Sequence, residues 1–188
     1  MIESQKGLEV EVKAKINDRK VEEKLLSSGG IFVSEENQVD TYFQHPCYDL
    51  KKKDEALRVR ESGGNIYLTF KGPRIDKETK TRCEIEVKVE GDIFSLLEAI
   101  GFLPLARIKK KRRTFRWRNL QVCVDRVEKL GSFIEIEGKS FEEKHDIFYL
   151  LDILGINRGC LIRKSYLELL CEGKNERKNS WKDRKANC

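Results

Sequence analysis

The sequence predicts an α+β fold in which a closed antiparallel β-barrel has charged residues on its inner wall and helices on its outer wall. Three observations predict it. Many short segments alternate charged and apolar residues, three segments have the spacing and end signals of amphipathic helices, and like charges recur on one face of several strands. The 188 residues are enough for one domain with a single core.

The three predicted helices lie at residues 17–30, 92–101 and 140–155. Each begins at a polar capping residue and ends at glycine, and the third opens with a capping box at Ser140. All three have an apolar face that must be buried, so each is expected to pack on a sheet.

The alternating segments can be sorted into two faces, because residues two apart in a strand point the same way. Segment 9–16 places Glu9, Glu11 and Lys13 on one face and only valine, alanine and isoleucine on the other. The same sorting of the remaining segments gives charged faces that contain Arg58, Arg60, Lys71, Arg82, Glu84, Glu86, Lys110, Arg112, Asp125, Glu135 and Glu137.

A charged face on a single strand would ordinarily face water. Two observations favour the opposite orientation here. Like charges such as Glu9 and Glu11 are adjacent on one face, which is mildly destabilising unless a ligand compensates them. The helices must also cover the apolar faces, which turns the charged faces toward a shared interior. Closure of that sheet leaves no exposed edge, and the charged interior needs water, metal or polyanion to fill it.

The two signs of charge suit a triphosphate and its metal. Cationic side chains can surround phosphate oxygens, which arginine binds through a fork of N–H groups. Carboxylates are the hard oxygen ligands that Mg²⁺ and Mn²⁺ prefer. The predicted phosphate ligands are Lys13, Arg58, Arg60, Lys71, Lys110 and Arg112, and the predicted metal ligands are Glu9, Glu11, Glu135 and Glu137.

The two halves of the chain look duplicated. Residues 9–13 recur in pattern at residues 84–88, and each copy is followed by a capped helix, a glycine stop and a strand. This order predicts a pseudo-symmetric barrel made of two β-helix-strand units.

Composition excludes several other classes of protein. With 38 basic and 32 acidic residues, the net charge is only +6. A nucleic-acid binder usually has a larger excess of basic residues, so nucleic acid is not an expected partner. No apolar run approaches the ~20 residues of a membrane helix, and no signal peptide is evident, so a cytoplasmic protein is expected. The cysteines form no C-x-x-C pair and the two histidines are isolated, which disfavours a zinc site or a Ser-His-Asp triad.

We expect a single domain over residues 1–170. Residues 171–188 are almost without apolar side chains and are expected to form a basic, flexible tail. A homodimer is compatible with the sequence, which does not determine the oligomeric state.

A family resemblance supports these interpretations. The segment Glu9-x-Glu11-x-Lys13 resembles the E-x-E-x-K signature of the CYTH superfamily, the triphosphate tunnel metalloenzymes, which contains class IV adenylyl cyclases and thiamine triphosphatases. The resemblance extends from about Leu8 to Leu170. Further motifs in family order are Gln38-x-Asp40-Thr41-Tyr42-Phe43, Leu57-Arg58-Val59-Arg60, Leu68-Thr69-Phe70-Lys71-Gly72-Pro73, Arg82-x-Glu84-x-Glu86, Lys110-x-Arg112, Asp125-x-Val127, Leu130-Gly131-x-Phe133-x-Glu135-x-Glu137 and Lys164-Ser165-Tyr166-Leu167-x-Leu169-Leu170.

The resemblance implies an eight-stranded antiparallel tunnel, a divalent metal (Mg²⁺ or Mn²⁺) and a nucleoside or organic triphosphate. Segments 69–73 and 130–137 are most similar to the class IV adenylyl cyclases predicted in prokaryotes, which convert ATP to cyclic AMP and pyrophosphate. On this hypothesis Lys13 and Asp125 are the catalytic candidates, and Lys164 closes one mouth of the tunnel. Glu84 or Glu86 is a possible further metal ligand.

Two alternative functions are also compatible with the sequence. A hydrolase acting on inorganic tripolyphosphate, thiamine triphosphate or a nucleotide would need the same metal and phosphate ligands. A non-catalytic polyphosphate or RNA-binding module is suggested by the basic runs at residues 51–53 and 109–113, but few aromatic residues are interleaved with them.

Overall fold

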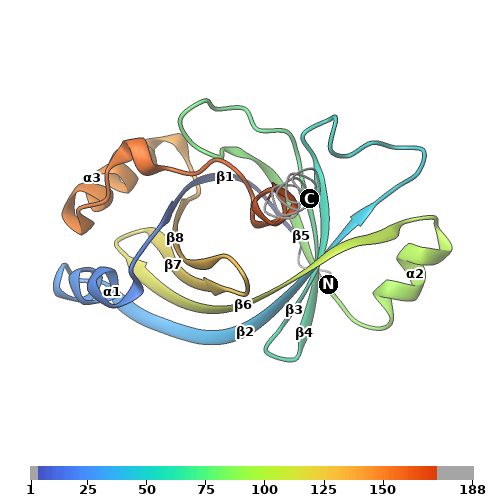
Figure 1. Cartoon of the computed structure of the whole chain (residues 1–188), viewed down its shortest axis with the longest axis horizontal. Coiled ribbons are helices and arrows are strands. Elements are labelled where there is room, and N and C mark those ends of the chain that lie inside the picture. Colours follow the sequence, from blue (N-terminus) through green and yellow to red (C-terminus); the bar gives the residue numbers. More distant parts are fainter. Residues whose placement is uncertain (1–3, 173–188) are drawn as a thin grey trace, which may run out of the picture.

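The computed structural model describes residues 4–172, which form a closed barrel of eight antiparallel strands with helices outside it (Figure 1). This confirms the predicted fold class. The order around the barrel is β1-β5-β4-β3-β2-β6-β7-β8. The strands are β1 (Ser4–Lys15), β2 (Ile31–Gln44), β3 (Ala56–Ser62), β4 (Asn65–Lys71), β5 (Arg82–Val89), β6 (Leu103–Trp117), β7 (Leu120–Val127) and β8 (Gly131–Gly138).

The strand order agrees with the predicted duplication. Each half has the order strand, helix and three strands, with α1 (Asp18–Ser27) after β1 and α2 (Ile93–Ala99) after β5. Exchanging the two halves reproduces the same barrel order read in the opposite direction, with β1 beside β5 and β2 beside β6. The two E-x-E segments, on β1 and β5, are therefore on neighbouring strands.

The largest core lies outside the barrel wall, under α1 and α3 (Lys144–Leu154). Leu25 of α1 and Leu151 of α3 are fully buried against outward side chains of β1, β6, β7 and β8, such as Val10 and Ile136. Each such side chain stabilises the fold by about 1.5–3 kcal/mol relative to exposure. Because these helices occupy the apolar side of the sheet, the charged side of the same strands must face inward.

The start of the third helix differs from the prediction. Ser140 makes no side-chain capping bond, and a 3₁₀ turn at Phe141–Glu143 precedes α3. The Glu143 carboxylate instead accepts a hydrogen bond from the backbone N–H of Lys139. The predicted capping box is therefore wrong, because the 3₁₀ turn moves the first α-helical residue to Lys144.

One end of the barrel is closed by the C-terminal part of the described chain. Ile162 donates its backbone N–H to the carbonyl of Lys13 at 2.7 Å, and residues 166–172 are helical. Tyr166 is buried against Phe133 inside the barrel, and Figure 1 shows this red segment within the barrel outline. Residues 171 and 172, the first two of the predicted tail, belong to this helical segment, and residues 173–188 lie outside the described part of the chain.

Within residues 4–172, no helix has the length and apolar content needed to cross a bilayer.

Candidate active site

The inward faces of the strands enclose a cavity of about 750 Å³. Its described lining contains nine basic and seven acidic side chains, so the wall has a formal excess of positive charge. Twelve of the fourteen predicted site residues line it, namely Glu9, Glu11, Lys13, Arg58, Arg60, Lys71, Glu84, Glu86, Lys110, Arg112, Glu135 and Glu137. The remaining two, Asp125 and Lys164, lie elsewhere.

Three carboxylates gather on adjacent strands. Strand β1 contributes Glu9 and Glu11, and β8 places Glu137 directly opposite Glu11. One oxygen from each of the three lies within 4.8 Å of the others. Burial and the neighbouring charge of Glu9 raise the pKa of Glu137 to about 8, and burial also raises the pKa of Glu9. Below about pH 8, Glu137 therefore holds a proton that a bound cation would replace.

The carboxylate cluster fits a hard divalent cation. Its donors are all carboxylate oxygens, which suit Mg²⁺ or Mn²⁺ better than softer metals. Oxygen Oε2 of Glu9 is buried and has no hydrogen-bond partner in the structure. Buried polar atoms are usually paired, so this oxygen is available to coordinate a metal ion. The residues present therefore fit the metal that the sequence predicts.

Other predicted metal ligands are engaged by cations instead. Glu84 contacts the Lys71 ammonium, and Glu135 contacts the Arg112 guanidinium. Glu86 lies nearer the rim, with a side chain that is 40% exposed. These three carboxylates neutralise the cationic wall and do not join the cluster.

Asp40 organises one part of the cationic wall. Its carboxylate accepts hydrogen bonds from Arg60 Nε and Nη2 at 2.7 and 2.9 Å, and it lies 3.7 Å from Arg58 and 3.6 Å from Lys110. Burial opposes ionisation of Asp40, but these cations overcome it and hold its pKa well below the usual range. Three predicted phosphate ligands are thus fixed by one buried carboxylate.

Asp125 has the same role on the opposite wall. It is completely buried and accepts two hydrogen bonds from Arg112, both at 2.7 Å, one from Lys110 at 3.3 Å and one from the Tyr166 hydroxyl at 3.0 Å. It lies behind these groups and not on the cavity surface. Its geometry suits positioning of Arg112 and Lys110 rather than direct contact with a ligand.

The Lys13 ammonium points into the cavity without a hydrogen-bond partner. Its nearest paired carboxylate oxygen, on Glu135, is 3.6 Å away, and its Nζ lies 4.1 Å from the centre of the Tyr166 ring. Burial and the positive charge of Lys80 lower the pKa of Lys13 to about 7. The Lys13 side chain can therefore lose its proton and become a neutral amine near physiological pH.

Lys164 does not line the cavity. Its side chain is 53% exposed and forms an ion pair with Glu172 at 2.7 Å, on the helical segment that closes the barrel. The structure thus places it at the closed end but outside the chamber.

The basic run at residues 109–113 is divided by the strand it belongs to. Lys110 and Arg112 face inward, whereas Lys111 and Arg113 face outward and pair with Glu35. The run therefore does not form one continuous basic surface.

Four charged residues that line the cavity, Asp40, Lys80, Arg82 and Lys139, are not among the predicted site residues. The face assignment placed Arg82 on an inward charged face without giving it a role. Asp40 lies in an alternating segment with other inward residues, so the same assignment could have found it. Lys80 lies in the irregular segment 72–81, where no periodicity indicates a direction.

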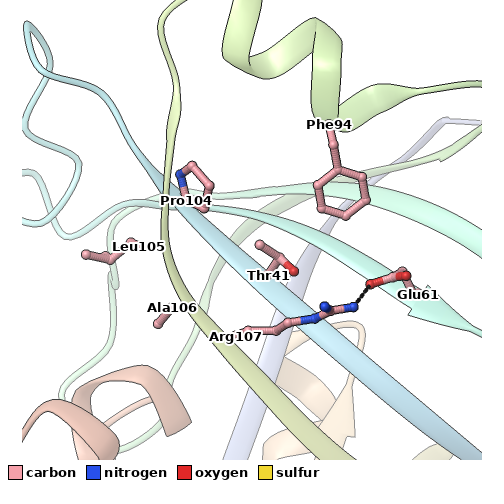
Figure 2. Close-up of a pocket in the computed structure, with 7 residues that line it drawn as sticks. All are labelled: Thr41, Glu61, Phe94, Pro104, Leu105, Ala106 and Arg107. Atoms are coloured by element: carbon pink, nitrogen blue, oxygen red, sulfur yellow. Dashed lines mark hydrogen bonds and ion pairs between the residues drawn. The ribbon is translucent and has the colours of Figure 1, made fainter.

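A second hollow of about 490 Å³ lies outside the barrel beside α2 (Figure 2). Phe94 and Pro104 flank it, Thr41 lies at its base, and Arg107 pairs with Glu61 at 2.9 Å. It contains none of the predicted site residues.

The sequence and the fold of this chain are similar to those of known proteins. The sequence profile of the CYTH domain family matches residues 7–166. A Methanocaldococcus jannaschii protein named a "putative adenylate cyclase" is 40% identical over 171 residues, covering 86% of this chain and 98% of that protein. The Aeromonas hydrophila adenylate cyclase CyaB is 26% identical over 152 residues, covering 76% of each chain. The solved structure of a Pyrococcus horikoshii protein superposes with a TM-score of 0.78 at 39% identity, covering 88% and 99% of the two chains.

Proposed function

Because the chain belongs to the CYTH domain family, we propose that it is a metal-dependent enzyme acting on a triphosphate, and that it converts ATP to cyclic AMP and pyrophosphate. The observation that carries this proposal is the separation of charge inside one chamber. A cluster of three carboxylates lies on β1 and β8, and cations fixed by Asp40 and Asp125 surround the remaining space. Carboxylates suit the metal, and the cations suit the polyanion.

The carboxylates and the cations of the chamber have different proposed roles. Glu9, Glu11 and Glu137 would hold the metal, which when bound supplies positive charge to phosphate oxygens. The guanidinium groups of Arg58, Arg60 and Arg112 and the ammonium groups of Lys71 and Lys110 would bind the phosphate chain. Because buried carboxylates already hold several of these cations in place, little reorganisation is needed when the substrate binds.

In the cyclase reaction the ribose 3′-oxygen forms a bond to the α-phosphorus, and the bond from that phosphorus to the bridging oxygen of pyrophosphate breaks. The hydroxyl proton must be accepted as the new bond forms. Lys13 is the described side chain that we assign to this step, because its Nζ faces the cavity without a hydrogen bond and its pKa is lowered to about 7.

Product identification tests the proposal directly. The purified protein is incubated with ATP, tripolyphosphate or thiamine triphosphate, each with Mg²⁺ or Mn²⁺, and the products are separated by chromatography. We expect cyclic AMP and pyrophosphate in equal amounts from ATP. Orthophosphate as the main product from any of the three would contradict the cyclase assignment and support a triphosphate hydrolase.

The hydrolase is the second candidate, and one observation favours it. Among the described residues that line the cavity, the aromatic side chains are Tyr42 and Tyr166, and both pack in the apolar cluster at the closed end. The described lining therefore offers no aromatic side chain at the open end to stack on a purine. Inorganic tripolyphosphate would not require one.

A non-catalytic RNA-binding module is less favoured. The division of residues 109–113 between the two faces of β6 removes the continuous basic surface that phosphate tracking would need.

Metal binding is expected to strengthen as the pH rises to about 8. Glu137 holds a proton below its raised pKa, and that proton must leave when a cation binds, so apparent affinity should fall up to about tenfold per pH unit below 8. Calorimetric titration of Mn²⁺ at pH 6, 7 and 8, in buffers of different ionisation enthalpy, measures both affinity and released protons. Glu137→Gln should lose this pH dependence, whereas equal affinities at pH 6 and 8 in the unmodified protein would contradict the assignment.

A further inference from the structure

Lys80 reaches the carboxylate cluster from the irregular segment 72–81. Its backbone N–H donates to the carbonyl oxygen of Glu11 at 2.8 Å, which holds the residue beside β1. Its side chain is only 5% exposed, and its Nζ donates to Oε1 of Glu11 at 2.5 Å. The flanking residues Thr79 and Thr81 are also buried, and their hydroxyl oxygens lie 2.5 Å apart. Both the backbone and the side chain therefore fix this ammonium at Glu11.

Lys80 is the closest cation to the carboxylate cluster among the described side chains that form ion pairs with it. The other two members have more distant partners. Lys71 Nζ lies 3.6 Å from Glu9, and Arg112 Nη1 lies 3.9 Å from Glu137. Without a metal, the ammonium of Lys80 therefore supplies the nearest positive charge to a cluster whose members repel one another.

A divalent cation at Oε1 of Glu11 would be repelled by the Lys80 ammonium, which is hydrogen-bonded to the same oxygen. Mg²⁺ binds carboxylate oxygens at about 2.0–2.1 Å, so an ammonium hydrogen-bonded to that oxygen would lie against a doubly charged ion. This repulsion favours departure of the ammonium from Oε1 of Glu11 when a cation binds there. Glu135 is a further anion whose charge favours the protonated form of Lys80, and phosphate oxygens would be another.

We propose that Lys80 is a built-in counter-ion of the metal site, which holds Glu11 in place before the metal binds and is displaced by it. This inference rests on the proposed metal site at Glu9, Glu11 and Glu137. It has two consequences. Metal binds more weakly to the free protein than three carboxylates alone would allow, and a triphosphate strengthens metal binding because its oxygens accept the displaced ammonium.

The test is calorimetric titration of the full chain with Mn²⁺ alone at constant pH. Lys80→Gln is expected to bind Mn²⁺ about tenfold more tightly than the unmodified protein, because no ammonium has to be displaced. Lys139→Gln is the matched control, since it removes the same charge from the rim of the same cavity. Its affinity should change by less than about threefold, because Lys139 is exposed and its charge is screened.

The outcomes separate this inference from the proposed metal site. If the unmodified protein binds no Mn²⁺, the metal site itself is wrong. If it binds Mn²⁺ but Lys80→Gln binds equally or less tightly, the metal site stands and the counter-ion role is overturned.

A second measurement does not depend on the folding of Lys80→Gln. In ¹⁵N-labelled protein the buried Lys80 ammonium should give a slowly exchanging signal, assigned by its loss in Lys80→Arg. Addition of Mg²⁺ should shift this signal or speed its exchange with water. An unchanged signal at a Mg²⁺ concentration that saturates the protein would overturn the proposal.

Discussion

Replacing Glu137 with glutamine is expected to lower metal-dependent turnover at least about 1,000-fold while leaving the barrel folded. Glutamine has the shape of glutamate but no negative charge, so the carboxylate cluster of Glu9, Glu11 and Glu137 loses a charged metal ligand. The fold should tolerate the change, because burial and Glu9 already disfavour the ionised form of Glu137 and raise its pKa to about 8.

The raised pKa of Glu137 also determines whether Glu137→Gln is more or less stable than the unmodified protein. Glu137 has a higher pKa in the folded chain than in the unfolded chain, so it contributes stability below about pH 4.5 that is lost as the pH rises through about 8. Glutamine does not ionise and avoids this loss. Metal-free Glu137→Gln should therefore be more stable than the unmodified protein by up to about 4–5 kcal/mol at pH 8, and little different at pH 5.

Turnover assays and urea unfolding at pH 5 and 8 measure both effects. Glu61→Gln is the control, because Glu61 lies outside the barrel and pairs with exposed Arg107. It should change neither quantity appreciably. Full activity in Glu137→Gln would exclude Glu137 as a metal ligand, and a loss of stability at pH 8 would contradict the repulsion within the cluster.

The alternation of residues 9–13 was sufficient to predict which side chains of β1 face inward, because a strand has a strict period of two. The amphipathic helices then fixed which face was inside. The sequence could not show how the inward carboxylates divide between metal and cations, because that depends on cross-strand register. Glu137 faces Glu11 and joins the cluster, whereas Glu135, two residues away, faces Lys13 and neutralises a cation.

Irregular segments were the other limit of sequence reasoning. Lys80 approaches Glu11 from a connection without periodicity, so no pattern indicated its direction. Asp125 was identified as a site residue, but its burial behind Arg112 and Lys110 became evident only from the packing of Tyr166. In both cases the missing information was a contact between segments distant in sequence.

Asp125→Asn is expected to have the opposite effect on stability from Glu137→Gln, although both changes replace a buried carboxylate with an amide. Burial opposes ionisation of Asp125, but Arg112 and Lys110 overcome it and lower its pKa, so its charge is stabilised in the folded protein. Removing it leaves two buried cations with a weaker partner. The free energy of unfolding should fall by about 3–5 kcal/mol. Triphosphate affinity should also fall, because Arg112 is no longer held in its forked hydrogen bond.

Tyr166→Phe is the matched comparison, because it removes one hydrogen bond to Asp125 and leaves the charge in place. Its cost in stability should be only about 1–2 kcal/mol. Urea unfolding of both variants and calorimetric titration with tripolyphosphate test these expectations. If Asp125→Asn were as stable as the unmodified protein and bound tripolyphosphate equally well, Asp125 would not position the cationic wall. The sign of the stability change therefore distinguishes Glu137, a carboxylate expected to bind a metal cation, from Asp125, a carboxylate already paired with Arg112 and Lys110.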